Sequence, residues 1–381
     1  MLSPIVYLDN NATTRPVPGV VTAVIRALEA DWANPSSVHG LGQEVARAVA
    51  SSREQVAQLL GVRAERVVFT SGATEANEAV LRHYAKLGAA LITSAAEHPA
   101  VSGYYFQQAP QLVQTVPLDE SGFWRLDELE TVLKRINGPK LIAFAWANGE
   151  TGVLQDLAAI KFLAERYGAL CLADASQAVG RIAFEADSEV YLTFSGHKLH
   201  GPKGVGVLVQ PETLPSVKIA VGGGQERGWR GGTLNVPGIA GLGVACELRK
   251  SNLGSAITQM SRLRDGFESK VMAAIPDIRV NGADAPRVPN TSNLMVPGVD
   301  GMALVARLEA RGILCSQVSA CSSGRPEPSR TLLAMGLSRD DAYASLRIAV
   351  SVDTREEEIE IAAKALVEEA LFLREMMGGL V

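Results

Sequence analysis

Two polar residues stand at the ends of two apolar runs, where their side chains could hold a reactive organic cofactor. Asp174 ends the run 169–173, and Lys198 follows the run 190–194 after a short Ser-Gly-His turn. A lysine amine can bond to the aldehyde of pyridoxal phosphate, and a carboxylate can keep its ring nitrogen protonated. Considered alone, Lys198 would more often be a surface lysine that happens to follow a strand. The combination with Asp174 predicts a pyridoxal-phosphate site.

Residues 71–78 could hold the phosphate of such a cofactor. They form a turn of small residues between the apolar run 66–70 and a helix, and Thr74 offers a hydroxyl there. Backbone N–H groups and the positive end of the helix dipole at such a turn favour a phosphate dianion. Plain N-capping by Ser71 or Thr74 would explain the same residues. The interpretation of residues 71–78 as a phosphate-binding site therefore depends on the separate evidence from Asp174 and Lys198.

His98 follows the strand-like run 91–94 and precedes a helix. An imidazole in this place can stack on a planar heteroaromatic ring and exchange protons near neutral pH. A lone histidine there would more often be a loop residue. Its place in the chain between the phosphate candidate and the Asp174 and Lys198 pair favours a role at the site.

Strands and helices alternate from about residue 66 to residue 210, which predicts βαβ units and a mainly parallel sheet. Ligands of such sheets bind beyond the carboxyl ends of the strands. The segments expected together on that rim are those around Thr74, His98, Asn148, Asp174 and Lys198.

Length and composition bound the class of protein. A chain of 381 residues with 47% hydrophobic and 20% charged residues favours two domains, and the pattern beyond about Asp277 predicts that the second is α+β. A net charge of −5 gives no basic field for nucleic acid. The sequence has no run long enough to span a bilayer and no secretory signal, so we expect no membrane contact and a cytoplasmic location.

The four cysteines do not form a disulfide framework, and no spacing among them suggests zinc or another metal. Cys171 and Cys246 are expected in the core, and Cys315 is expected to be buried at the end of a strand. Cys321 lies in a small, polar segment punctuated by Pro and Gly, which predicts an accessible thiol in a loop.

These residues sit in motifs that resemble the cysteine desulfurases, which are pyridoxal-phosphate enzymes of the class V aminotransferase group. The resemblance runs from Tyr7 to about the C-terminal helix. Its most specific motifs are YLDNNATT (7–14), FTSGATE (69–75), DASQ (174–177), SGHK (195–198), GGGQERG (222–228), and SACSSG with EPS (319–329). The segment around Cys321 resembles the group of the family with a long catalytic loop.

The resemblance implies an α/β fold of type I. A large pyridoxal-phosphate-binding domain (16–255) would contain a mainly parallel seven-stranded sheet. A small α+β domain (1–15 and 256–381) would carry the catalytic cysteine loop. The implied activity converts L-cysteine to L-alanine and leaves a persulfide on Cys321. The implied partners are a second copy of the chain and a protein sulfur acceptor, with an iron–sulfur cluster scaffold among the candidates.

The resemblance also implies the role of each site residue. Lys198 would bind the cofactor covalently and move protons at the substrate Cα. Asp174 would pair with the ring nitrogen, Gln177 with the ring oxygen, and His98 would stack on the ring. Further cofactor contacts are implied for Ala73, Thr74, Ser195 and His197, the last three at the phosphate, and for Thr233 at the phosphate of the partner subunit. Substrate contacts are implied for Arg347, at the carboxylate, and for Asn10 and Asn148.

The chain departs from the family pattern at three places. The family pattern has a second asparagine before Glu150, and this chain has Gly149 there. The change implies altered binding of the substrate or of the cofactor ring. The Ser-Gly that the family has before the cysteine loop is Gln317-Val318, and the glycine expected after Arg347 is Ser351. These differences leave the expected cofactor unchanged.

Two other functions fit parts of the same sequence. A pyridoxal-phosphate lyase that cleaves the C–S or C–Se bond of cystine or selenocysteine would not need Cys321. A degenerate sulfur-relay scaffold would need no cofactor, and the intact Lys198, Asp174 and His98 argue against it.

Overall fold

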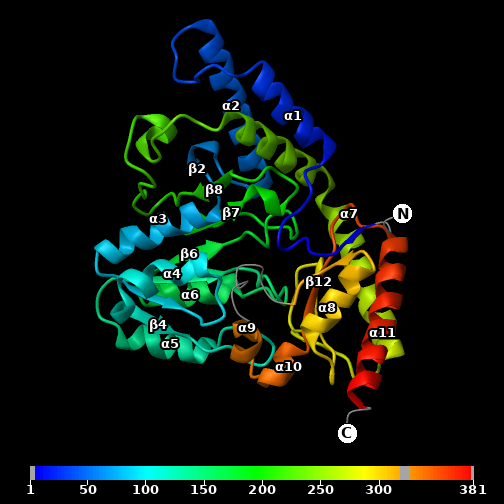
Figure 1. The fold of residues 1–381 in the computed structure, drawn as a ribbon. Coiled ribbons are helices and arrows are strands. Elements are labelled where there is room, and N and C mark those ends of the chain that lie inside the picture. The colour runs from blue at the N-terminus through cyan, green and yellow to red at the C-terminus, as the bar shows by residue number, and fades with distance from the viewer. Residues whose placement is uncertain (1–4, 318–326, 379–381) are drawn as a thin grey trace.

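The computed structural model of the protein describes residues 5–317 and 327–378 (Figure 1). The segment 318–326, which holds Cys321, lies outside the described residues, as do the first four and last three residues of the chain. The expectation of an accessible Cys321 in a loop therefore stays a prediction.

A seven-stranded sheet organises the first two thirds of the chain, in the order β2-β8-β7-β6-β5-β3-β4. Its strands are β2 (Val67–Thr70), β3 (Ala90–Thr93), β4 (Val113–Thr115), β5 (Lys140–Ala145), β6 (Ala169–Asp174), β7 (Val190–Ser195) and β8 (Gly206–Val209). Five of them, β7, β6, β5, β3 and β4, pair in parallel. β8 runs antiparallel to both of its neighbours. The prediction of a mainly parallel seven-stranded sheet is confirmed.

The direction of β8 follows from the short connection that precedes it. Only residues 196–205 separate β7 from β8, and they contain one 3-10 turn, η3 (Gly196–Lys198). A parallel crossover needs about a dozen residues or more, whereas an antiparallel return needs few. The turn that carries Lys198 is therefore also the turn that reverses the chain.

Helices cover both faces of this sheet, which explains why its inner strands read as unbroken apolar runs. α3 (Ala73–Lys86) and α4 (Pro99–Gln108) pack on one face. The other face contacts α2 (Gly40–Leu60), α5 (Leu126–Arg135), α6 (Leu157–Arg166) and the start of α7 (Val236–Ala274). α1 (Pro18–Glu29) packs against α7 rather than the sheet (Figure 1).

The C-terminal third forms a smaller α+β layer with its own buried cluster of hydrophobic side chains. Its antiparallel sheet has the order β12-β10-β9. The elements are β9 (Arg279–Val280), β10 (Thr291–Met295), α8 (Gly301–Ala310), β11 (Ile313–Leu314), α9 (Arg330–Ala334), α10 (Arg339–Tyr343), β12 (Ser345–Ala349) and α11 (Glu356–Gly378). The division into domains 16–255 and 1–15 with 256–381 stays a prediction, which the separate clusters support.

The N-terminal segment crosses between the two layers. β1 (Val6–Tyr7) pairs in parallel with β11, and Asp9 bridges to Ala349, the last residue of β12. The 3-10 turns η1 (Ala64–Arg66), η2 (Pro110–Leu112) and η4 (Gln225–Gly228) complete the described elements. No helix of the described residues is long and apolar enough to cross a membrane.

Candidate active site

The carboxyl ends of the parallel strands lie at one edge of the large sheet, and the segments expected there follow them. β2 leads into α3 at Thr74, β3 into His98, β5 into Asn148 and β7 into Lys198, while Asp174 is the last residue of β6. The structure thus confirms the topological rule that these segments share a rim.

The start of α3 is held against the end of β7. The Ala73 N–H donates to Ser195 Oγ over 2.8 Å, and Thr74 is exposed in the first turn of the helix. Gly206, at the start of β8, lies close to Gly72, the residue before α3. A Cβ at position 206 would come within 2.5 Å of Gly72 Cα. Only glycine allows this approach, so β8 fixes the helix N-terminus that the phosphate would meet.

Asp174 is 8% exposed and is oriented by two donors. The Asn77 side-chain amide donates to its Oδ2 over 2.7 Å, and the Ser176 N–H donates to its Oδ1 over 2.9 Å. Asn77 in turn accepts a hydrogen bond from the Thr193 hydroxyl, over 2.6 Å. Asn77 was not predicted from the sequence, because its burial and its contact with Asp174 become visible only in the fold.

The Lys198 amine is directed at the N-terminal segment. It donates to the backbone carbonyls of Asn11 and Ala12, the second over 2.8 Å. Gln177 contacts the same segment, since its side-chain amide donates to the Asn11 carbonyl over 3.0 Å. The side-chain oxygen of Gln177 accepts from Arg181, which the sequence analysis also missed.

Two histidines border the site in different protonation environments. His98 caps α4, since its Nδ1 accepts from the Ala100 N–H over 3.1 Å. Desolvation by the surrounding protein lowers the pKa of His98, and Asp174 opposes that effect. His197 contacts the Thr13 hydroxyl through Nδ1 over 3.0 Å. Burial, then Lys198 and Lys203, lower the pKa of His197 to about 4, so it is neutral at pH 7.

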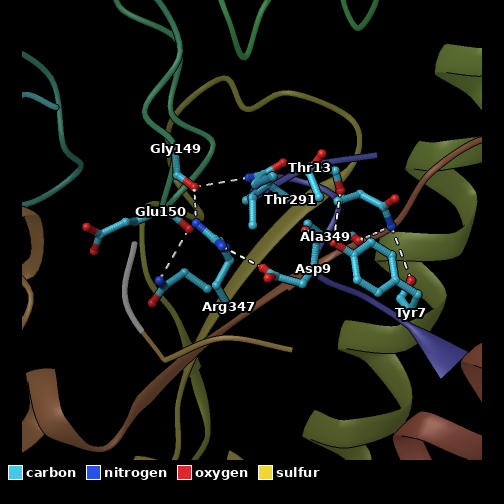
Figure 2. Close-up of polar contacts among 12 residues, drawn as sticks. Tyr7, Asp9, Thr13, Gly149, Glu150, Thr291, Arg347 and Ala349 are labelled. Carbon is cyan, nitrogen blue, oxygen red and sulfur yellow. Dashed lines mark hydrogen bonds and ion pairs between the residues drawn. The ribbon is translucent and has the colours of Figure 1, made fainter. Parts of the chain in front are cut away.

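Arg347 projects from β12 toward the rim and is 2% exposed (Figure 2). It donates to Asp9 Oδ1 over 2.6 Å and to the Gly149 carbonyl over 3.0 Å. Asn148 shapes this turn, because its Oδ1 accepts from the N–H groups of Glu150 and Thr151. Gly149 therefore contributes a backbone acceptor where the family pattern has a side chain.

The other expected residues lie in less direct positions. The side-chain amide of Asn10 donates to the backbone carbonyls of Ala349 and Tyr7, over 2.8 and 3.2 Å. Thr233 is exposed in the glycine-rich segment before α7. Their contacts with a substrate and with a partner subunit stay predictions, as do the roles of the residues above.

The described cysteines differ in burial. Cys171 and Cys246 are 2% and 0% exposed, which confirms that they are core residues. Cys315 follows β11 as expected, yet it is only half-buried. Burial, then Asp9, raise the pKa of the Cys315 thiol to about 12, so it is a poor nucleophile at neutral pH.

Glu97, beside His98, is a buried carboxyl group that the sequence analysis did not single out. Its oxygens accept from the Ala145 N–H over 2.6 Å and from the Trp124 indole N–H over 3.3 Å. Burial raises the pKa of Glu97 from 4.5 to about 8. The stability that its protonated form provides is therefore fully present below about pH 4.5 and is lost as the pH rises through 8.

We expect Glu97→Gln to flatten the pH dependence of the free energy of unfolding. From pH 5 to pH 8 the wild type should lose roughly 4 kcal/mol more than the variant, because glutamine does not titrate. Urea unfolding at the two pH values measures this difference. Glu120→Gln, an exposed site, is the control that should behave as the wild type does. Equal pH dependence in wild type and Glu97→Gln would contradict a carboxyl group that is neutral at pH 7.

The residues at the rim fit pyridoxal phosphate by the chemistry of their donors and acceptors. An amine, a carboxylate held by two donors, and a helix N-terminus joined to a serine hydroxyl come from adjacent strand ends. They match the aldehyde, the ring nitrogen and the phosphate of that cofactor.

Comparisons with known proteins agree with this site. The family model described as aminotransferase class-V matches residues 6–361. A cysteine desulfurase of a Nostoc species is 40% identical over 373 residues, 96% of this chain and 92% of that protein. A NifS-like protein from Rickettsia africae has a TM-score of 0.88 and 30% identity, covering 96% of this chain and 99% of that one. A structure titled SspA in complex with cysteine has a TM-score of 0.76 and 28% identity, covering 91% and 98%.

The chain belongs to the aminotransferase class-V family. Within that family it is a cysteine desulfurase of the NifS-like kind and depends on pyridoxal phosphate. The cofactor and the class of enzyme that the sequence predicted are confirmed.

Proposed function

We propose that the chain takes sulfur from L-cysteine, releases L-alanine, and holds the sulfur as a persulfide on Cys321 for transfer to a protein acceptor. The observation that carries this proposal is the meeting of Lys198 and Asp174 at the ends of adjacent parallel strands in a cysteine desulfurase chain. The relative whose structure holds cysteine supports the choice of substrate.

The rim residues would hold the cofactor in one orientation. Asp174 would pair with the ring nitrogen, because Asn77 and Ser176 already fix its two oxygens. The N-terminus of α3 with Thr74, Ser195 and neutral His197 would hold the phosphate. When bound there, pyridoxal phosphate withdraws electrons from the substrate Cα. Gln177 and His98 would contact the ring oxygen and the ring face.

Arg347 would bind the substrate carboxylate. Its guanidinium group is buried, and its Nε has no hydrogen-bond partner among the described residues. A buried guanidinium gains most from a bidentate anionic partner. Its bonds to Asp9 and Gly149 hold it in place beforehand, so that the substrate meets an oriented donor.

Lys198 and Cys321 would act on opposite parts of the substrate. The Lys198 amine would leave the carbonyls of Asn11 and Ala12 and carry a proton to and from Cα. The Cys321 thiolate would attack the substrate sulfur, so that a new S–S bond forms as the C–S bond breaks. One cysteine and one thiol thus give one alanine and one persulfide, and the equation balances without an external oxidant.

The enzyme would act with two protein partners, a second copy of its own chain and a sulfur acceptor. We expect a homodimer in which Thr233 reaches the phosphate of the partner subunit, because that residue is exposed on a glycine-rich segment. A protein acceptor, with an iron–sulfur scaffold among the candidates, would take the persulfide sulfur. A reducing cytoplasm suits a chain that needs a free thiol.

The products of L-cysteine turnover test this function. Incubation of the holoenzyme with L-cysteine and a thiol reductant should yield alanine and sulfide in equal amounts, measured by amino-acid analysis and a sulfide assay. Pyruvate and ammonia in place of alanine would indicate an eliminating C–S lyase, and Gly149 would then be the first residue to test. No cofactor absorbance and no turnover would indicate a sulfur-relay scaffold instead.

A further inference from the structure

A small, partly open cavity of 10 Å³ lies behind the turn that carries Lys198, where the two layers of the molecule meet. This volume is near the lower limit for one water molecule, so the cavity takes at most a single small body. The cavity is lined by Asn10, Thr14, Gly180, Arg181, Lys198, Leu199, His200, Arg249, Met260, Val350 and Ser351. Its walls come from the N-terminal segment, the connections that follow β6 and β7, α7 and the residues after β12.

Two buried arginines line this cavity without a carboxylate partner. Arg181 and Arg249 are 4% and 6% exposed. Within residues 5–317 and 327–378, neither guanidinium group has a carboxylate oxygen within 4.0 Å. A buried charge without an opposite charge costs several kcal/mol, so a compensating anion is expected nearby.

The two arginines use their donors differently. Arg181 donates only to neutral oxygens: Asn11 Oδ1 over 2.8 Å, the carbonyls of Asn10 and Lys198 over 3.3 Å, and Gln177 Oε1. Arg249 has no such partners, and its Nε and Nη1 are buried donors with no acceptor among the described residues. Orphaned buried donors are rare in folded proteins and usually mark a bound water or ion.

The charges around the cavity are mostly positive. Burial and then Arg249 and Arg347 lower the pKa of Arg181 to about 9, so it still carries its charge at pH 7. The Nδ1 of His200 is 2.8 Å from the Arg15 carbonyl, and burial lowers its pKa. Asp353 lies 3.6 Å from His200, and its charge also acts on Arg249, where it opposes the lowering of the pKa by burial, but its side chain is 59% exposed. Water screens this carboxylate, so it compensates little of the buried charge.

We propose that a small monovalent anion of the chloride class occupies this cavity and accepts hydrogen bonds from Arg249. The cavity is too small for a phosphate or a carboxylate ligand, and its cationic walls disfavour a metal ion. The site is separate from the α3 N-terminus that would hold the cofactor phosphate, and it does not depend on the proposed function. The anion would join the Lys198 turn to α7 and to the segment after β12.

The holoenzyme should be more stable in chloride than in a large anion at the same ionic strength. We expect Tm in sodium chloride to exceed Tm in sodium gluconate by about 3 °C when chloride is far above its Kd. Arg249→Gln should abolish that difference, and its Tm in gluconate should equal or exceed that of the wild type, because a costly buried charge is gone. Lys250→Gln, the next and exposed position on α7, should keep the full chloride effect.

Crystals of the wild-type holoenzyme grown in bromide provide a second measurement that does not depend on a variant. An anomalous bromide peak beside Arg249 Nε and Nη1 would support the proposal. A water molecule in the cavity, with equal Tm in chloride and gluconate, would overturn it. Both outcomes are independent of alanine and sulfide formation, so failure of this proposal is distinguishable from failure of the proposed function.

Discussion

Lys198→Ala should lower the rate of alanine formation from L-cysteine by about 10⁴-fold or more. Among the described residues, the two neighbouring histidines are the candidates for a substitute base, and each already has another contact. His98 caps α4 with Nδ1, and His197 contacts Thr13. The variant should still fold, since the Lys198 amine donates to the backbone carbonyls of Asn11 and Ala12 in a loop and not to a residue of the hydrophobic core. Initial rates of alanine release, with Tm as the check on folding, measure the effect.

Lys203→Ala is the matched control for Lys198. It removes an exposed lysine from the same connection between β7 and β8. We expect its turnover to stay within about threefold of the wild type, and its pyridoxal phosphate to survive dialysis as in the wild type. Dialysis should remove the cofactor from Lys198→Ala faster, because only non-covalent contacts remain. Turnover of Lys198→Ala within tenfold of the wild type would refute its assignment.

Cys321→Ala should lower both alanine and sulfide formation by about 10³-fold or more and leave the amount of bound cofactor unchanged. The thiolate is the group that receives the sulfur, and the rim residues that would hold the cofactor do not include it. Sulfide production and the visible absorbance of the cofactor, recorded on the same sample, separate loss of chemistry from loss of cofactor. Persistent sulfide release together with pyruvate would show that the C–S bond breaks without Cys321.

Cys315→Ala is the control that tests which thiol carries the sulfur. Burial and Asp9 raise the pKa of the Cys315 thiol to about 12, so almost none of it is ionised at pH 7. This variant should retain most of the desulfurase activity. A loss as large as that of Cys321→Ala would assign a direct part in sulfur transfer to Cys315.

The sequence identified those site residues whose place follows from local pattern. Asp174 and Lys198 each follow an apolar run, and a run of this kind ends at the rim of a parallel sheet in this topology. His98 and Thr74 were proposed in the same way, as polar residues near the start of the helix that follows a strand. The direction of β8 was not foreseen, although the short connection of residues 196–205 before it was a usable signal for an antiparallel strand.

The partners that orient these residues were missed because they are distant in the chain. Asn77 and Asp174 are 97 positions apart, and Arg347 and Asp9 are 338 apart. Neither pair has a spacing that a single sequence could reveal. The buried pair Arg181 and Arg249 was missed for a related reason, since a lysine or arginine in an amphipathic pattern normally faces water.

The mass of the protein after one turnover tests the central claim most directly. The wild-type holoenzyme is mixed with L-cysteine without reductant, digested with trypsin, and its cysteine peptides are analysed by mass spectrometry. Cys315 and Cys321 share the tryptic peptide 312–330, so fragmentation of that peptide must assign the added sulfur to one of them. We predict one added sulfur atom on Cys321, and none on any peptide of Lys198→Ala. Added sulfur on Cys315 alone, or alanine formed with no sulfur on any cysteine, would contradict the account.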